Sequence, residues 1–204
     1  MLEIVLASSN QGKLKEIQSL LAGQNLIVRP QSEFNIPDAV EDGLTFVENA
    51  IIKARHACRL SGLPSLADDS GLEVDYLNGQ PGIYSSRYAG ESSNNALNNQ
   101  KLLTKLTGIE QAQRTARFQC VIVYMQHELD PTPIICQGTW EGLIAETLTG
   151  KQGFGYDPLF IIPERQCTSA ELPADIKNKI SHRGQALAKL VKALQNKQDT
   201  LTHA

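Results

Sequence analysis

Residues 2–23, LEIVLASSNQGKLKEIQSLLAG, place a short apolar run, a polar loop and an amphipathic segment one after another. The largely apolar run from Leu2 to Ala7 is typical of a buried strand. Apolar residues then recur at helical spacing, at Leu14, Ile17, Leu20 and Leu21. Gly23 ends this helix, and the next apolar run, NLIVR at 25–29, predicts a second strand. The chain therefore opens with a strand, a loop, a helix and a strand, as a βαβ unit does.

The strongest helical pattern begins after Thr45, an N-cap residue that Glu48 follows three positions later, as in a capping box. Its apolar stripe consists of Val47, Ala50, Ile51, Ala54, Ala57 and Cys58. Gly62 ends the pattern. The preceding segment, 30–43, predicts a loop, and the acid Glu41 lies near its end.

The middle of the chain is rich in β-forming residues. PSLADD, at 64–69, predicts a short strand that ends at two aspartates. GLEVDYLNG, at 71–79, shows the alternation of a half-buried strand at Leu72, Val74 and Tyr76. We therefore expect the two aspartates at the edge of a strand.

Two long β-rich runs follow, ARFQCVIVYMQ at 116–126 and PIICQGTWEGLIAE at 133–146, and the short connection between them predicts an antiparallel hairpin. The residues from Ser169 onward carry two helical patterns, and Ser181 is a candidate N-cap of the last one. A βαβ-like opening followed by an antiparallel pair predicts an α/β or α+β fold around a mixed sheet, because a purely parallel sheet would need a crossover at every step.

Composition places the chain among ordinary globular proteins, with 204 residues, 41% hydrophobic and 20% charged. This length fits one domain over residues 1–204, or two lobes that share one core, and no linker or repeat is evident. The formal net charge of −3 excludes a broad basic surface. A nucleic-acid polymer is therefore not an expected partner.

The sequence also bears on the compartment. The first residues, MLEIVLASSN, lack the basic start of a signal peptide, and no segment approaches the roughly 20 apolar residues that span a bilayer. The four cysteines are dispersed without a C-x-x-C spacing, at Cys58, Cys120, Cys136 and Cys167. We expect a cytoplasmic protein with no membrane partner, whose cysteines are reduced thiols of the core.

The loop from Ser8 to Lys13, SSNQGK, has residues suited to binding an anion. The helix that follows offers free N–H groups and the positive end of its dipole, and Lys13 adds a full charge. The loop is not a Walker A motif, which would need glycine at Ala7 and a hydroxyl at Leu14. A capped helix start with a solvated lysine explains the same residues without a ligand.

The two aspartates, Asp68 and Asp69, allow two interpretations. With Ser70 and Gly71 they are typical of a solvated turn. At the end of a strand in an α/β sheet they would instead face a ligand crevice beside the polar loop. Carboxylates beside phosphates require a cation between them, and Mg²⁺ prefers such hard oxygen ligands. Glu41 is the candidate for a second carboxylate, and an ordinary surface acid of the loop is the alternative.

The segment GFGYDP, at 153–158, offers the flat faces of Phe154 and Tyr156 and the acceptor Asp157, a combination that could hold a heterocyclic base. A structured turn with both aromatic rings in the core is the alternative. Three possible donors lie further along the chain, at Lys177, His182 and Arg183. They form either a solvated basic patch or contacts to a carbonyl-rich or anionic ligand, because cations at a helix start oppose its dipole.

Five motifs occur in the order found in the inosine triphosphate pyrophosphatase family, which hydrolyses non-standard purine nucleoside triphosphates to the monophosphate and pyrophosphate. They are LASSNQGKLKEI, EDGLTFVENAIIKA, LADDSGLEVDYLNGQPGIYSSRYAG, QGFGYDPLF and SHRGQALAKL. They extend over nearly the whole chain, which therefore resembles this family throughout. One departure is SSN where some relatives carry threonine and glycine, but it keeps a hydroxyl at Ser8.

The resemblance implies an elongated, twisted mixed β-sheet flanked by helices, with two lobes that enclose a nucleotide cleft. It implies Mg²⁺ dependence and a homodimer. The triphosphate would be held by Ser8, Ser9, Asn10, Gln11, Gly12 and Lys13. Asp69 would be a metal ligand or general base, and Ser70 would contact the substrate. The base would be held by Phe154, Gly155, Tyr156, Asp157, Lys177, His182 and Arg183.

These assignments lead to a mechanistic hypothesis. A water activated by Asp69, directly or through Mg²⁺, attacks the α-phosphorus, and Lys13 neutralises charge on the departing pyrophosphate. Asp68 orders the metal shell or its neighbour, and the sequence leaves open which aspartate is the base. Hydrogen-bond donors suit the 6-keto oxygen of inosine and xanthine, whereas adenine carries an amine there. Nothing in the sequence explains how guanine is rejected.

Three other functions stay open at this point. A pyrophosphatase for a modified pyrimidine nucleotide would carry a similar phosphate loop and acidic site and would differ at the base. A nucleotide sensor without catalysis would have no need for the pair Asp68 and Asp69 together with Lys13. A plain interaction domain would need none of these motifs.

Overall fold

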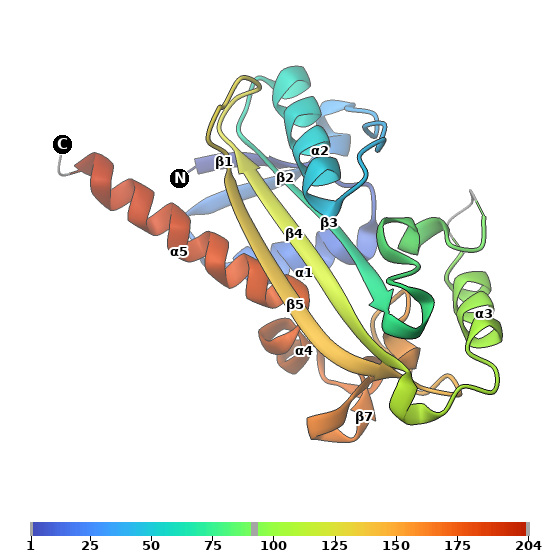
Figure 1. Cartoon of the computed structure of the whole chain (residues 1–204). Coiled ribbons are helices and arrows are strands. Elements are labelled where there is room, and N and C mark those ends of the chain that lie inside the picture. The colour runs from blue at the N-terminus through green and yellow to red at the C-terminus, as the bar shows by residue number, and fades with distance from the viewer. Residues whose placement is uncertain (1, 91–93, 203–204) are drawn as a thin grey trace. The chain divides into compact units, whose positions relative to one another are not determined.

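The computed structural model describes residues 2–90 and 94–202. Its strands are β1 (Leu2–Leu6), β2 (Leu26–Pro30), β3 (Ser65–Val74), β4 (Thr115–Met125), β5 (Ile134–Ile144), β6 (Phe160–Ile162) and β7 (Cys167–Thr168). Its α-helices are α1 (Gln11–Leu21), α2 (Phe46–Ser61), α3 (Asn95–Lys105), α4 (Ala174–Ile180) and α5 (His182–Thr202) (Figure 1). The strands form a seven-stranded sheet in the order β2-β1-β3-β4-β5-β6-β7. β1 is parallel to β2 and β3, whereas β6 is antiparallel to β5 and β7, so the predicted mixed sheet is confirmed.

The chain forms two compact units, in agreement with the two lobes expected from the resemblance. Unit 1 comprises Met1–Asp69, Cys120–Gly138 and Arg183–Ala204, and unit 2 comprises Ser70–Gln119 and Thr139–His182. Strands β3, β4 and β5 each contribute residues to both units.

In unit 1 the helices cover both faces of the strands. One core packs α1 and α5 against the strands through Leu14, Ile17, Leu187, Leu190 and Leu194, among others. A second core packs α2 on the opposite face, through Ala50, Ala54, Ala57 and Cys58 (Figure 1). In β3, Leu66 belongs to the first core and Ala67 to the second, because successive strand residues point to opposite faces.

The helix starts and ends follow the predicted caps. Asn10 caps α1 by accepting a hydrogen bond from the backbone N–H of Lys13, and Thr45 caps α2 by accepting from the N–H of Glu48. Gly62 ends α2 in the left-handed conformation, with φ of 69°. These local signals are reliable because the bonds satisfy backbone groups that the helix itself leaves open.

The prediction that a strand ends at the two aspartates is wrong. β3 continues from Ser65 to Val74, so both aspartates lie inside a strand and both are buried. Gly71 is a buried strand residue, so the alternative of a solvated turn at residues 68–71 is wrong. Tyr76, expected to continue the alternation, instead lies in a short 3₁₀ turn, Asp75–Leu77, and is 49% exposed. Turn-forming residues are tolerated within β3 because cations pair with its two buried carboxylates, Lys13 and Arg183 with Asp68 and Lys53 with Asp69.

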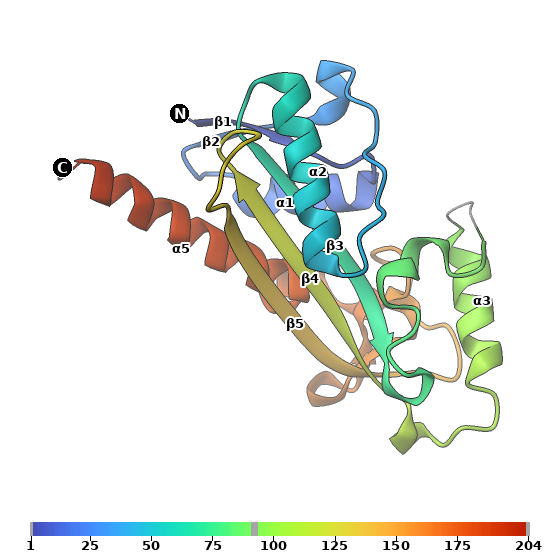
Figure 2. The ribbon, with the colours of Figure 1, turned by 45° about the horizontal axis from the view of Figure 1, so that its top comes forward.

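In unit 2, β5 pairs with β6 and α3 lies beside the short 3₁₀ segment Gly82–Arg87 (Figure 2). β4 and β5 are adjacent and joined by residues 126–133, a connection too short for a parallel pair, so the predicted hairpin is confirmed. The core of this unit includes Leu72, Tyr88, Leu102, Phe118, Trp140, Tyr156 and Phe160.

Two expectations about the whole chain can be compared with the described residues. The four cysteines are free thiols; Cys58, Cys120 and Cys136 are buried, while Cys167 is half-buried. Across residues 2–90 and 94–202, none of the helices has the length and apolar character that a bilayer crossing requires.

Candidate active site

The polar loop between β1 and α1 is held by its own side chains. Ser8 Oγ accepts a hydrogen bond from the N–H of Asn10 at 3.2 Å, and Ser9 Oγ donates to Asp38 at 2.8 Å. Ser9, Asn10 and Gln11 are exposed. Lys13 extends its ammonium group inward to Asp68, at 3.1 Å. The loop thus presents hydroxyl, amide and backbone donors at a helix start, a combination suited to phosphate oxygens.

Asp68 lies on the face of β3 that α1 and α5 cover. Its Oδ2 is 3.1 Å from Lys13 Nζ and 3.2 Å from Arg183 Nη2. Arg183, 2% exposed, also pairs with Glu16. Burial by itself disfavours the ionised form of Asp68, but Lys13 and Arg183 outweigh it and hold the pKa of this carboxyl well below its usual range. Asp68 is therefore a permanent anion that anchors two cations.

Asp69 lies on the opposite face of the same strand, where α2 packs. Its Oδ1 accepts from Lys53 Nζ at 3.1 Å, and its Oδ2 accepts from the amide of Asn49 at 3.3 Å. Lys53 Nζ is also 3.3 Å from an oxygen of Glu41. Burial raises the pKa of Asp69 and nearby Glu41 adds to the rise, although Lys53 and Lys13 act against it.

The two neighbouring aspartates therefore have opposite environments. β-strand geometry sends Asp68 and Asp69 to different faces, so the two carboxylates form ion pairs with different cations. The pKa of the first is lowered and the pKa of the second is raised. The opposite pKa shifts suit the two carboxylates to different roles. Asp68 stays ionised and positions other groups, whereas Asp69 is suited to exchange a proton.

The donor set around Asp69 fits a nucleotide-bound Mg²⁺ ion. Glu41 and Asp69 converge on the same Lys53 ammonium group, which marks a position where both carboxylates face one cation. Mg²⁺ usually takes one or two carboxylates together with substrate phosphates and waters. Within the part of the chain that the structure describes, there is no cluster of three or more His, Cys, Asp or Glu side chains that would form an all-protein metal site.

In unit 2, Asp157 organises the GFGYDP loop. Its carboxylate accepts from the N–H of Phe154 at 2.8 Å, from Ser169 Oγ at 2.8 Å and from Lys177 Nζ at 2.6 Å. Gly153 has φ of 77°, and a Cβ at this position would lie 2.0 Å from Asp157 Oδ2. Glycine is therefore required there both for its backbone conformation and for the close approach of the carboxylate.

The aromatic residues of this loop differ in exposure. Tyr156 is buried and donates its hydroxyl hydrogen to the carbonyl of Ser85 at 2.8 Å, whereas Phe154 is half-buried, with Lys177 Nζ 5.4 Å from its ring centre. Tyr156 thus has the core role that the sequence left open. Phe154 is partly accessible and lies beside the Lys177 cation, so it is the aromatic residue of this loop that could contact a base.

His182 packs among aromatic rings. Its imidazole is stacked on Phe118, with ring centres 4.7 Å apart and an interplanar angle of 13°, and lies 6.4 Å from the ring centre of Trp140. The ring is 5% exposed. This stack fixes the orientation of the imidazole plane.

The predicted residues fall into two groups. Unit 1 holds residues 8–13, Glu41, Asp68, Asp69 and Arg183. Unit 2 holds Ser70, Phe154, Gly155, Tyr156, Asp157, Lys177 and His182. Arg183, expected from the resemblance at the base with His182, contacts the carboxylates of Asp68 and Glu16 in unit 1. The residues next to Arg183 in the sequence did not reveal these contacts. The role of a buried cation depends on the anions that it contacts, and these can lie far away along the chain.

Comparison with known proteins places this arrangement in a family. A model of the Ham1 family matches residues 4–193. The chain belongs to the Ham1 family. The match extends from β1 into α5 and so includes both groups of candidate residues, which confirms the resemblance drawn from the five motifs.

Several Ham1-like proteins are similar over nearly their full length. A Vibrio cholerae protein named dITP/XTP pyrophosphatase is 57% identical over 96% of this chain and 98% of its own. The solved structure of a HAM1 protein from Coxiella burnetii has 55% identity and a TM-score of 0.89, and the match covers 96% of this chain and all of that one. A Mycobacterium abscessus structure described as a nucleoside-triphosphatase and dITP/XTP pyrophosphatase has 36% identity and a TM-score of 0.73, over 95% of this chain and all of that one.

Sequence reasoning missed three residues that contact the candidate site residues: Glu16, Asn49 and Lys53. The signal for two of them was present, because Asn49 and Lys53 are four residues apart and so share one side of α2. An asparagine beside the apolar stripe of a helix is unusual, and Asn49 is fully buried.

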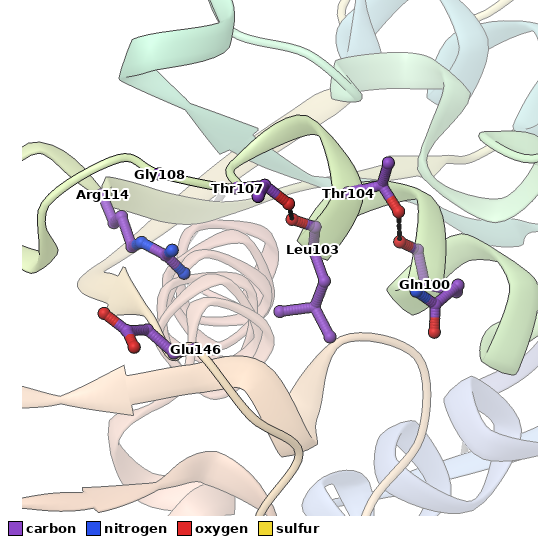
Figure 3. A pocket seen from close by; sticks show the side chains of 7 residues that line it. All are labelled: Gln100, Leu103, Thr104, Thr107, Gly108, Arg114 and Glu146. Carbon is purple, nitrogen blue, oxygen red and sulfur yellow. Dashed lines mark hydrogen bonds between the residues drawn. The ribbon is translucent and has the colours of Figure 1, made fainter.

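A cavity of about 300 Å³ lies at the end of α3 (Figure 3). Its lining is Gln100, Leu103, Thr104, Thr107, Gly108, Arg114 and Glu146, and includes none of the candidate site residues. Arg114 donates to the carbonyls of Leu106, Ile109 and Ala145. Because cations stabilise the carbonyl end of a helix, this guanidinium serves to close α3.

Proposed function

We propose that this chain is a dITP/XTP pyrophosphatase, which hydrolyses non-standard purine nucleoside triphosphates, in ribose or deoxyribose form, to the monophosphate and pyrophosphate. The observation that carries the proposal is the position of Asp69, a buried carboxylate with raised pKa that shares the Lys53 cation with Glu41. The near-full-length similarity to a Vibrio cholerae protein of that name supports the same activity.

The chemistry follows from the two faces of β3. A water attacks the α-phosphorus and gives up a proton to Asp69, while the bond from the α-phosphorus to the bridging oxygen breaks and pyrophosphate leaves. A carboxylate with raised pKa is a stronger base than an ordinary one, which suits Asp69 to this step. No covalent enzyme intermediate is required.

Residues Ser8 to Lys13 hold the triphosphate in this proposal. Their hydroxyl, amide and N–H groups donate to phosphate oxygens, and Lys13 neutralises charge that develops on the leaving pyrophosphate. Asp68 is a positioning residue, because it fixes the ammonium group of Lys13 and the guanidinium of Arg183. Arg183 then acts on this side of the chemistry instead of at the base.

Glu41 and Asp69 would hold a Mg²⁺ ion, which when bound supplies positive charge to the phosphates and favours ionisation of the attacking water. Lys53, between the two carboxylates, keeps their mutual repulsion low in the free enzyme.

Phe154, Gly155, Asp157, Lys177 and His182 hold the base, Tyr156 supports this loop from the core, and Ser70 contacts the nucleotide. The half-exposed ring of Phe154 offers a stacking face, and Asp157 keeps Lys177 in place. Donors at the 6-keto oxygen of hypoxanthine or xanthine would be left unpaired by the amine of adenine, a loss that discriminates strongly. A homodimer, a cytoplasmic location and one catalytic domain over residues 1–204 are further parts of the proposal, and they rest on the family resemblance.

Pyrophosphate release from dITP, XTP, GTP, ATP and dUTP, each with and without Mg²⁺, tests the proposal. We expect Mg²⁺-dependent release from dITP and XTP far above release from the other three. Preference for dUTP would instead identify a pyrophosphatase for unusual pyrimidine nucleotides. Tight binding of dITP without turnover would identify a nucleotide sensor.

A further inference from the structure

Asn49 is a fully buried polar side chain on the side of α2 that faces β3. Burying an amide costs free energy unless its donors and acceptor are bonded. Its Nδ2 donates to Asp69 Oδ2 at 3.3 Å, and its Oδ1 accepts from the backbone N–H of Gly43 at 2.9 Å. The N–H of Gly43 requires an acceptor, which fixes the orientation of the amide and leaves its donor toward Asp69.

The partner Gly43 belongs to the loop that carries Glu41. A Cβ at Gly43 would lie 2.7 Å from Asn49 Oδ1 and 2.7 Å from Glu48 Cβ. The backbone of this loop therefore approaches the amide more closely than any residue with a side chain could. The side chain of Asn49 is thus hydrogen-bonded both to Asp69 and to the backbone of Gly43, two residues after Glu41.

The hydrogen bond to Gly43 is not needed to start the helix. Glu48 already accepts from the N–H of Leu44 and from the hydroxyl of Thr45, and Thr45 accepts from the N–H of Glu48. These bonds already cap the start of α2. The hydrogen bonds of Asn49 are additional to this cap. One is made to Asp69 and the other to the loop that carries Glu41, and these two acids converge on Lys53.

We propose that Asn49 is a positioning residue that fixes Asp69 and the Glu41 loop relative to each other, so that the two carboxylates are arranged for a divalent cation before it binds. The inference rests on the proposed function, because it assigns Asn49 to the same site. Side chains that orient the ligands of a metal change affinity or activity by roughly 10- to 100-fold when they are replaced.

Two variants disturb the connection between Asp69 and the Glu41 loop, one at Asn49 and one at its partner Gly43. Asn49→Leu keeps the branched shape of the side chain, with a larger volume, and removes both hydrogen bonds. Gly43→Ala keeps Asn49 but places a methyl group against its amide oxygen. For each variant we would measure kcat and KM for dITP, the Kd of Mn²⁺ for the nucleotide-free protein by electron paramagnetic resonance, and Tm.

Ser65→Ala is the matched control. Ser65 lies four residues before Asp69 on the same face of β3, is fully buried, and donates to the carbonyl of Ala54 in α2 at 2.7 Å. Its replacement removes a bond between the same two elements without touching either carboxylate. We expect it to lower Tm and to leave kcat and the Kd of Mn²⁺ within about twofold of the wild type.

We expect Asn49→Leu and Gly43→Ala to lower kcat by roughly 10- to 100-fold and to raise the Kd of Mn²⁺ by about tenfold, with KM for dITP changed less than about threefold. KM for dITP changes little because residues 8–13 and the residues that hold the base keep their contacts with the substrate. If Asn49→Leu lowers Tm but keeps wild-type kcat and Mn²⁺ affinity, the inference is overturned and Asn49 is only structural. Should Gly43→Ala fail to fold, Asn49→Leu decides alone.

The two proposals fail separately. A wild-type protein that binds Mn²⁺ but does not hydrolyse dITP refutes the proposed function, while the Mn²⁺ affinities of the variants still decide the role of Asn49. A wild-type protein that hydrolyses dITP, with variants that match the control, refutes the role of Asn49 alone. A wild-type protein that neither binds Mn²⁺ nor hydrolyses dITP refutes both.

Discussion

Replacement of Arg183 by methionine, R183M, tests the electrostatics of unit 1. The guanidinium is 2% exposed and contacts the carboxylates of Asp68 and Glu16. Methionine keeps most of the side-chain bulk and removes the charge. Removing one partner of a buried ion pair costs about 3–5 kcal/mol, because the remaining charge stays buried. We expect R183M to lower the free energy of unfolding by about that amount at neutral pH.

The loss should depend on pH in a definite direction. Lys13 and Arg183 hold the pKa of Asp68 below its unfolded-state value of about 3.9, so this carboxylate stabilises the fold above that value. That stabilisation is lost as the pH falls through the folded-state pKa. In R183M the pKa of Asp68 rises, because fewer cations oppose the effect of burial. The unfolded chains titrate alike at Asp68, so the difference in free energy of unfolding between wild type and R183M is largest near neutral pH and narrows once the pH falls below the folded-state pKa of Asp68 in the variant.

Urea unfolding of wild type and R183M, in a series from about pH 7 to about pH 3.5, measures this difference. R117M is the control, because Arg117 pairs with Asp75 at the surface, where such contacts contribute about 0–1 kcal/mol. The reasoning is refuted if R183M loses no more stability than R117M, or if its loss grows as the pH falls.

Three further predictions concern single residues. Asp69→Asn should reduce kcat for dITP at least about a hundredfold if this carboxylate is the base, and a near-normal rate in a steady-state assay would remove it from the mechanism. Gly153→Ala should raise KM for dITP and lower Tm, because the methyl group would displace the carboxylate of Asp157; unchanged values would mean that the GFGYDP loop tolerates the displacement. Cys120, whose pKa burial raises to about 12, should resist iodoacetamide near pH 8 in the folded protein while half-buried Cys167 reacts first, and mass spectrometry of the labelled peptides would reveal the opposite order.

The elements with strong local signals were predictable from the sequence. Thr45 and Gly62 delimit α2 because they satisfy backbone groups at its ends, and the spacing of Leu187, Leu190 and Leu194 reports the buried side of α5. The hairpin of β4 and β5 was predictable for a similar reason, since its strands are long and their connection is short.

The continuation of β3 through the two aspartates was not predictable from local pattern. Asp, Ser and Gly favour turns in isolation, and only the cations on both faces make a strand with buried carboxylates stable here. Those cations, Lys13 and Lys53, come from helices on opposite sides of the sheet, and Arg183 comes from far along the chain. Pattern reasoning within a window of neighbouring residues contains no information about such partners.

The candidate site was found as a set of residue types, but the roles within it needed coordinates. Ser8 to Lys13 and Asp69 were recognised by their motifs, whereas Asn49 and Lys53 were overlooked because they lie within a helix whose apolar stripe dominated its interpretation. The assignment of Arg183 to the base came from the family resemblance. Its contacts with Asp68 and Glu16 favour a different role.

The alternation of side chains in β3 makes the spacing of this strand as critical as its composition. Deleting or inserting one residue between Ser65 and Asp68 would rotate every later side chain to the other side of the sheet. Asp69 would then face the side of the sheet where Lys13 and Arg183 lie, and Asp68 would face the side where Asn49 and Lys53 lie. Natural variants of this segment should accordingly tolerate exchanges of apolar residues far better than any change in length.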